Sequence, residues 1–155
     1  MTGQIDARLN ELGLSLPEAA AAAANYLPYM VSGNLVFVSG QIPVVDGKLQ
    51  FQGKVGADYT TEEAAKCAKI CALNILAQVK AACDGDLDRV VRCVKLGGFV
   101  NCVDGFSEQP AVINGASNLM VDVLGDKGRH ARFAVGTNAL PMNVAVEIDA
   151  VFEIA

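Results

Sequence analysis

The amino-acid sequence predicts an α+β domain in which two main helices pack on one face of a mixed or antiparallel β-sheet. The chain has 155 residues, of which 52% are hydrophobic and 19% are charged, so it can form the core of a single domain. Segments 60–83 and 109–124 carry apolar residues at helical spacing. Segment 144–154 alternates between apolar and more polar residues, as a half-buried strand does.

The chain is expected to begin with two short helices. Residues 5–12 have the pattern of an amphipathic helix that ends at Gly13. Ser15 as N-cap and Pro17 in the first turn predict a second helix, which continues through a run of alanines and ends at Asn25.

Two hairpins are predicted after this region. Gly33-Asn34 forms a tight turn before the strand Leu35–Ser39, which ends at Gly40. Asp46-Gly47 is a second hairpin signal, and Lys48–Phe51 is the returning strand.

The central part of the chain gives the strongest signals. Thr60 and Glu63 have the spacing of a capping box, which places the start of the first main helix. The strand predicted next covers Val90–Val103, where Gly97 and Gly98 mark a bulge or a close approach by other backbone.

The last two predicted strands are Arg132–Asn138 and Val144–Ile154, joined across Leu140-Pro141. We expect them to pair and to bring Glu147 near Arg132. One face of the final strand carries acidic residues beside apolar Val151, and so mixed a face in a small chain predicts that another subunit covers it.

The composition argues against several classes of function. With 12 basic and 17 acidic residues the net charge is −5, so a nucleic-acid partner is not expected. The single histidine, His130, excludes any site that needs two histidines from one chain, and we expect no metal. Five cysteines without a CxxC pair indicate reduced thiols in a cytoplasmic protein, and no segment is apolar enough to suggest a membrane partner.

Two motifs carry a family resemblance. Residues 131–148, with Arg132, Leu140-Pro141 and Glu147-Ile148, closely resemble the signature of the reactive-intermediate deaminase family (RidA, also called YjgF). Residues 33–43 resemble that family's first hairpin. Tyr26 lies at the family's tyrosine spacing before Ser39, and Asn114 matches its helix asparagine. The resemblance begins near Tyr26, so residues 26–155 are the predicted RidA-like domain of a divergent subgroup, and residues 1–25 are a helical extension.

The resemblance implies a chorismate-mutase-like fold and a homotrimer with clefts between neighbouring subunits. It also implies an enzyme of the 2-iminobutanoate/2-iminopropanoate deaminase type, active in metabolite damage control. Such enzymes hydrolyse enamines and imines of 2-amino acids, such as 2-aminoacrylate, to 2-keto acids and ammonia, and they need no metal or organic cofactor.

Arg132 and Glu147 are the predicted catalytic residues. A guanidinium can clamp a small carboxylate through two parallel hydrogen bonds, and a carboxylate can orient a water or carry its proton. Two alternatives stay open at this point. Arg132 could simply pair with Glu147 or Asp149 across the predicted hairpin, and Glu147 could be an ordinary solvated strand residue.

The predicted substrate-binding residues share the family motifs and are Tyr26, Ser39, Gly40, Asn114, Arg132 and Ala134. The ring of Tyr26 would wall the cleft, with plain packing as the alternative, and the backbone at Ser39-Gly40 would face the reacting end. The hydroxyl of Ser39 suits a strand-end hydrogen bond better than a nucleophile. Asn114 could be an ordinary helix-surface amide, and His130 is read as a loop residue.

Position 134 departs from the family pattern. Well-studied deaminases have a cysteine there, and Ala134 can contribute only its backbone carbonyl. The sequence therefore leaves two other functions open: a non-catalytic module that holds a 2-keto acid, and a ribonuclease or translation inhibitor. The negative charge and the lone histidine weigh against the latter.

Overall fold

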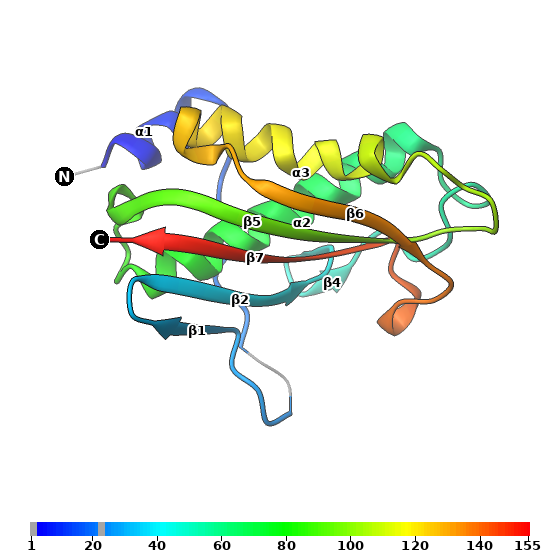
Figure 1. Ribbon diagram of the computed structural model, residues 1–155, viewed down its shortest axis with the longest axis horizontal. Helices are drawn as coiled ribbons and strands as arrows, with labels where there is room; N and C mark the ends of the chain where they lie inside the picture. The colour runs from blue at the N-terminus through cyan, green and yellow to red at the C-terminus, as the bar shows by residue number, and fades with distance from the viewer. Residues whose placement is uncertain (1–2, 22–23) are drawn as a thin grey trace.

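The computed structural model describes residues 3–21 and 24–155, and its main feature is a five-stranded sheet with two long helices on one side (Figure 1). In spatial order the strands are β1 (Tyr29–Ser32), β2 (Leu35–Gln41), β7 (Val146–Ile154), β5 (Val90–Asn101) and β6 (Ala131–Thr137). The β5–β6 pair is parallel and the other three pairs are antiparallel. The predicted α+β architecture with a mixed sheet is confirmed.

The two long helices are α2 (Thr61–Ala82) and α3 (Gln109–Leu124). The predicted capping box is present: the Thr60 hydroxyl accepts from the Glu63 N–H, and the Glu63 carboxylate accepts from the Thr60 N–H. The buried side of α2 is rich in alanine and cysteine, so α3 can come close. A Cβ at Gly115 of α3 would collide with the backbone carbonyl of Ala65, which explains the glycine there.

The first predicted helix is confirmed as α1 (Gln4–Glu11), but the second is wrong for residues 14–21, which have no helical structure. Residues 22 and 23 lie outside the described residues. A short alanine run cannot hold a helix without packing partners. The Gln78 side chain of α2 donates to the Ala20 carbonyl, and this hydrogen bond holds the segment against α2 in a non-helical conformation.

Both predicted hairpins are confirmed. The turn at Gly33-Asn34 joins β1 to β2, which continues two residues beyond Ser39. The Asp46-Gly47 turn joins the two short strands β3 (Val44–Val45) and β4 (Lys48–Leu49). Both glycines have positive φ, the conformation such turns require.

The predicted pairing of the last two strands is wrong. Helix α3 and a short helical turn, η2 (Gly125–Gly128), form the crossover that returns the chain parallel to β5, so β6 occupies the sheet edge beyond β5. The next connection passes through η3 (Pro141–Asn143), where Met142 and Asn143 have positive φ, and β7 then enters between β2 and β5. Strand β5 therefore separates β6 from β7.

Gly97 and Gly98 mark close approaches rather than a bulge. A Cβ at Gly98 would collide with Ile113 of α3, and one at Gly97 would collide with Asp149 and Phe133 on the opposite face. The neighbours are side chains, not the backbone that the sequence led us to expect. These two contacts also tell the two faces of the sheet apart: Ile113 lies on the helix side, and Asp149 and Phe133 lie on the open side.

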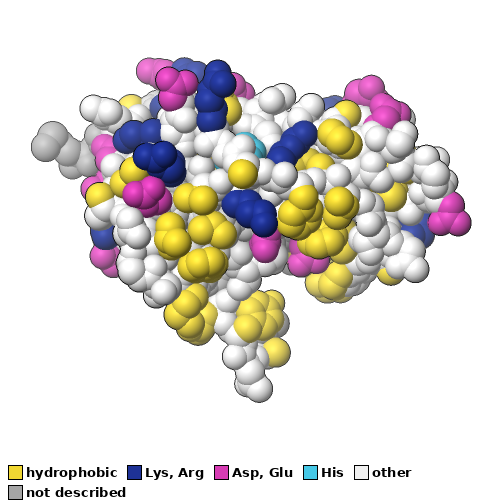
Figure 2. Space-filling model, in the orientation of Figure 1, with side chains coloured by type: hydrophobic (Ala, Val, Ile, Leu, Met, Phe, Trp, Pro, Cys, Tyr) yellow, Lys and Arg dark blue, Asp and Glu magenta, His cyan; other side chains and the backbone are white. Residues whose placement is uncertain are grey.

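The core lies between the sheet and the helices, and the opposite sheet face is open. The core includes Phe152, Ile148 and Leu96 from the strands and Ile75 and Ile113 from the helices. Large apolar side chains remain exposed on the strands: Met30, Phe37, Phe99 and Val135. Figure 2 shows hydrophobic side chains gathered in groups over the strands, with charged side chains between them. We call this surface the open sheet face.

Within the described ranges, none of the helices has the length and apolar character needed to cross a membrane.

Candidate functional site

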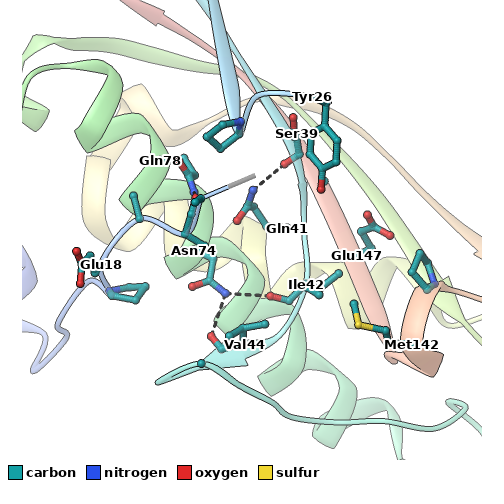
Figure 3. A pocket seen from close by; sticks show the side chains of 18 of the residues that line it. Glu18, Tyr26, Ser39, Gln41, Ile42, Val44, Asn74, Gln78, Met142 and Glu147 are labelled. Carbon is teal, nitrogen blue, oxygen red and sulfur yellow. Dashed lines mark hydrogen bonds between the residues drawn. The ribbon is translucent and has the colours of Figure 1, made fainter. Parts of the chain in front are cut away.

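Four of the predicted site residues, Tyr26, Ser39, Gly40 and Glu147, line one cavity of about 640 Å³ (Figure 3). The cavity lies beside the end of β2, where β1 no longer covers that strand. Figure 3 shows Tyr26 and Glu147 on one side, and Asn74 and Gln78 of α2 across from them. The structure thus brings together residues that are 121 positions apart at the extremes, from Tyr26 to Glu147.

Ser39 holds the loop that carries Tyr26. Its hydroxyl donates to the Leu27 carbonyl at 2.6 Å, and its N–H donates to the Pro28 carbonyl at 2.9 Å. The hydroxyl proton is therefore engaged in a structural hydrogen bond, and Ser39 lies inside β2, two residues before its end. Tyr26 itself is 55% exposed, so its ring stands at the mouth of the cavity rather than in the core.

Glu147 lies against the backbone of Gly40. The β2–β7 register shifts between Val38 and Gln41, which is a bulge at Ser39-Gly40. A Cβ at position 40 would collide with the Glu147 carboxylate, so any larger residue there would displace that carboxylate. Burial raises the pKa of the Glu147 carboxyl above its usual value, and the nearby Asp149 charge raises it further. A carboxyl with a raised pKa is suited to exchange protons near neutral pH.

The remaining predicted residues, Asn114, Arg132 and Ala134, lie elsewhere. One terminal nitrogen of Arg132, Nη1, donates to the Ser117 hydroxyl at 3.1 Å, and Nη2 donates to the Pro110 carbonyl at 3.4 Å. Asn114 lies one helical turn from both of these α3 residues and is exposed. Ala134, two residues after Arg132, is half-buried against the core.

Arg132 and Glu147 point to opposite sides of the sheet. Phe133, the neighbour of Arg132, lies on the open sheet face, where its ring contacts Phe99 at a centroid distance of 5.2 Å. Because side chains alternate along a strand, Arg132 points toward α3. The expectation that the two catalytic candidates meet within one chain is therefore wrong. Arg132 also has no carboxylate partner among the residues of 3–21 and 24–155, so pairing with Glu147 or Asp149 is wrong too.

Comparison with known proteins decides the family. The sequence profile of the family described as "YjgF/chorismate_mutase-like, putative endoribonuclease" matches residues 6–153. The chain belongs to the YjgF/chorismate-mutase-like family. Protein TCP17 of Trypanosoma cruzi is 48% identical to it over 154 residues, which cover 99% of this chain and 96% of that protein. The family resemblance predicted from the two motifs is confirmed.

Two solved structures of this YjgF-like fold are similar over nearly the whole chain. The protein Atu1372, of unknown function, from Agrobacterium tumefaciens is 55% identical with a TM-score of 0.92, covering 97% of this chain and 92% of its own. A "putative endoribonuclease" from Shewanella oneidensis MR-1 is 38% identical with a TM-score of 0.94, and the match covers 98% of this chain and 100% of that protein. Both therefore share almost all of segment 1–25, although its separation from 26–155 as a unit stays a prediction.

The N-terminal segment 17–21 forms one wall of this YjgF-family site. Two other residues were not expected from the sequence. Asn74 fixes the floor of the cavity by donating to the carbonyls of Ile42 and Val44 at 2.9 and 3.1 Å. Ser117 supports Arg132. Ser117 follows Asn114 by three residues on a predicted helix, and that spacing was the only available signal.

No group of three or more metal-ligating side chains occurs in the parts of the chain that the structure describes.

Proposed function

We propose that this YjgF-family chain hydrolyses small 2-imino acids and their enamines, of the 2-aminoacrylate type, to 2-keto acids and ammonia in a cleft between subunits of a homotrimer. The observation that carries the proposal is that Arg132 and Glu147 lie on opposite sides of one sheet. An imine hydrolase needs a group that binds the substrate carboxylate, which Arg132 provides, and a group that transfers protons, which Glu147 provides. One small substrate can contact both only if they come from different subunits.

The open sheet face supports this assembly. Phe37, Phe99 and Val135 are 45%, 39% and 42% exposed in the single chain, and contiguous exposed apolar surface on a sheet marks an interface. A trimer closed by rotation joins two different patches at each interface. That geometry can bring the Arg132 edge of one subunit to the Glu147 cavity of the next.

In the proposed reaction, Arg132 grips the substrate carboxylate and fixes the C2 carbon beside a water. Glu147, as the carboxylate, takes a proton from the water while the oxygen attacks C2, and it passes this proton to the imine nitrogen, which gives a carbinolamine. Glu147 then takes the proton of the carbinolamine hydroxyl and delivers it to the amine nitrogen as the C–N bond breaks, so ammonia leaves and the C2 carbonyl forms. An enamine first tautomerises to the imine by gaining a proton at C3 and losing one from nitrogen. Water is the only second substrate in this balance.

The other predicted residues have supporting roles in this proposal. Tyr26 would cover the cavity mouth, the bulged backbone at Ser39-Gly40 would face the imine nitrogen, and Asn114 would extend the polar surface beside Arg132. Ala134 would offer its carbonyl only. All five cysteines are free and buried, in keeping with a protein that works in the reducing cytoplasm.

A non-catalytic module that binds a 2-keto acid in the same cleft is the second candidate. The observation that favours it is the methyl group at Ala134, which supplies no thiol at the position where well-studied deaminases have one. Binding of a 2-keto acid by a trimer that releases no ammonia would favour this candidate. The family profile and the Shewanella oneidensis structure both carry the description "putative endoribonuclease". The net charge of −5 speaks against RNA as the substrate here.

The test is release of ammonia and 2-keto acid from freshly generated 2-aminoacrylate. We expect Arg132→Ala to lose at least about a hundredfold in kcat/KM, because substrate anchoring and orientation are both lost. Arg129→Ala is the matched control, since Arg129 is exposed and pairs with Asp126. Equal rates for wild type and Arg132→Ala would defeat the proposal, and cleavage of RNA that depends on Arg132 would replace it.

A further inference from the structure

A chain of three hydrogen bonds links Arg132 to the backbone. Its Nη1 lies 3.1 Å from the Ser117 hydroxyl oxygen, and that oxygen lies 2.9 Å from Nε2 of His130. The other ring nitrogen, Nδ1, lies 2.6 Å from the Gly128 carbonyl oxygen. The chain thus connects β6, α3 and η2, three elements that pack together at the sheet edge.

Each link has one direction. The Gly128 carbonyl can only accept, so Nδ1 of His130 carries a proton and donates it. In the uncharged ring, Nε2 then has a lone pair that accepts from the Ser117 hydroxyl. A guanidinium can only donate, so the Ser117 oxygen accepts from Arg132. Every donor in this arrangement has an acceptor of its own.

The arrangement holds the guanidinium from one side only. Nη1 is fixed by Ser117 and Nη2 by the Pro110 carbonyl, so two of the five N–H groups are engaged. The remaining N–H groups are available to a carboxylate. Ser117 and His130 are half-buried beneath the arginine, and neither belongs to the cavity that contains Glu147.

We propose that Ser117 and His130 are positioning residues that hold Arg132 in the orientation in which it grips the substrate carboxylate. This inference rests on the proposed function, in which Arg132 is the anchor. A free arginine side chain loses rotamer freedom when it binds, and an arginine already held in place loses less. The pair therefore acts on affinity and KM, and leaves kcat nearly unchanged.

The first experiment measures binding of pyruvate, as a probe 2-keto acid, to the assembled protein by calorimetry. We expect Ser117→Ala and His130→Phe to bind about tenfold more weakly than wild type. Ser117→Thr keeps the hydroxyl and is expected to bind within about twofold of wild type. Ser107→Ala, at an exposed serine just before α3, is the matched control and should bind normally. With an imine substrate, the same variants should raise KM by a similar factor at unchanged kcat.

The second experiment uses the fact that His130 is the only histidine. Nitrogen-15 NMR of histidine-labelled protein should show one imidazole, protonated at Nδ1 and unprotonated at Nε2. Ser117→Ala should shift the Nε2 resonance and leave the Nδ1 resonance in place. An imidazole protonated only at Nε2 would overturn the proposed hydrogen-bond chain. This measurement uses the wild-type protein, so it does not depend on whether the variants fold.

These results separate the inference from the proposed function. If the wild type binds pyruvate but releases no ammonia, the deaminase proposal is refuted. If Ser117→Ala then binds pyruvate weakly and Ser117→Thr recovers the affinity, the positioning role is still supported. Equal pyruvate affinity in wild type and Ser117→Ala overturns the positioning role, whatever the turnover. Wild type that binds no pyruvate overturns it as well, because the ordered arginine would then grip no carboxylate.

Discussion

Neither Arg132 nor Glu147 has an oppositely charged partner among residues 3–21 and 24–155. Arg132 is held by a hydroxyl and a carbonyl, and Glu147 lies against Gly40 with Asp149 nearby. A positive group without a counter-ion attracts a carboxylate, and a partly buried carboxyl with a raised pKa can exchange protons. Such arrangements are typical of a site that awaits a small organic acid.

Glu147→Gln tests the proton-transfer role and its cost. Because the pKa of Glu147 is raised in the folded chain, the stability linked to its proton is present below the unfolded pKa and is lost as pH rises through the folded value. We expect Glu147→Gln to lower kcat by about a hundredfold or more, and to raise the free energy of unfolding slightly at pH 7 but not at pH 4. Urea unfolding at both pH values and ammonia release measure the two effects. A variant less stable at pH 7 than wild type would contradict this account.

Gly40→Ala tests the contact that places Glu147. The added Cβ would collide with the carboxylate, and overpacking of this kind costs about 1–3 kcal/mol. We expect turnover to fall at least about tenfold, and we expect the shorter carboxylate of Gly40→Ala/Glu147→Asp to recover part of the stability. Thermal unfolding and initial rates provide the measurement. Normal stability and turnover in Gly40→Ala would show that the contact does not exist.

The sequence motifs identified the candidate site residues but not the residues that form hydrogen bonds with them. Arg132 and Glu147 stand out because each lies in a dense motif. The only signal for Ser117 is its helical spacing from Asn114, and no pattern indicates that the Ser39 hydroxyl donates to the Leu27 carbonyl. Such hydrogen bonds depend on how separate elements pack. Single-residue chemistry can be predicted from sequence, whereas the geometry of the site needs the fold.

At the scale of elements, the N-terminal segment has a definite role in the cavity. The Asp88 carboxylate accepts from the N–H groups of Ile5 and Gln4 at the start of α1, and these bonds lower the pKa of Asp88. Lys80 also pairs with Asp6 at 3.0 Å. The docked helix leads into segment 17–21, which lines the cavity.

Asp88→Ala is expected to release α1. Without the carboxylate the first N–H groups of the helix lose their acceptor, so amide exchange in residues 4–11 should become about tenfold faster. Substrate KM should change as well, because the cavity wall follows α1. Hydrogen exchange by mass spectrometry measures the first effect. Asp84→Ala, at an exposed carboxylate, is the control, and equal exchange in both variants would show that Asp88 does not dock the helix.

Elements with strong local signals were predicted well, and those set by the fold were not. The capping box at Thr60 and the turns at Gly33-Asn34 and Asp46-Gly47 depend on a few adjacent residues, and all three are present. The alanine run at 19–24 has strong helix propensity, yet residues 19–21 are not helical because they cross α2. The order of β5, β6 and β7 depends on the α3 crossover, which no local pattern reveals.

At the scale of the whole molecule, the proposed trimer has its interface on the open sheet face. Phe99 is 39% exposed there, and Val121 of α3 is exposed to a similar extent, 37%, on the helix side. We expect Phe99→Glu to produce monomers without turnover, because a charge on a buried interface is costly. Val121→Glu should remain trimeric and active. Sedimentation velocity distinguishes them, and a trimeric, active Phe99→Glu would place the interface elsewhere.

The most direct test of a shared site is complementation between two inactive proteins, Arg132→Ala and Glu147→Gln. After unfolding, mixing in equal amounts and refolding, each interface in a randomly assembled trimer has about a one-in-four chance of joining an intact arginine to an intact glutamate. We predict that the mixture recovers about a quarter of the wild-type rate, with native mass spectrometry confirming mixed trimers. Mixed trimers as inactive as either parent would contradict a site built from two subunits.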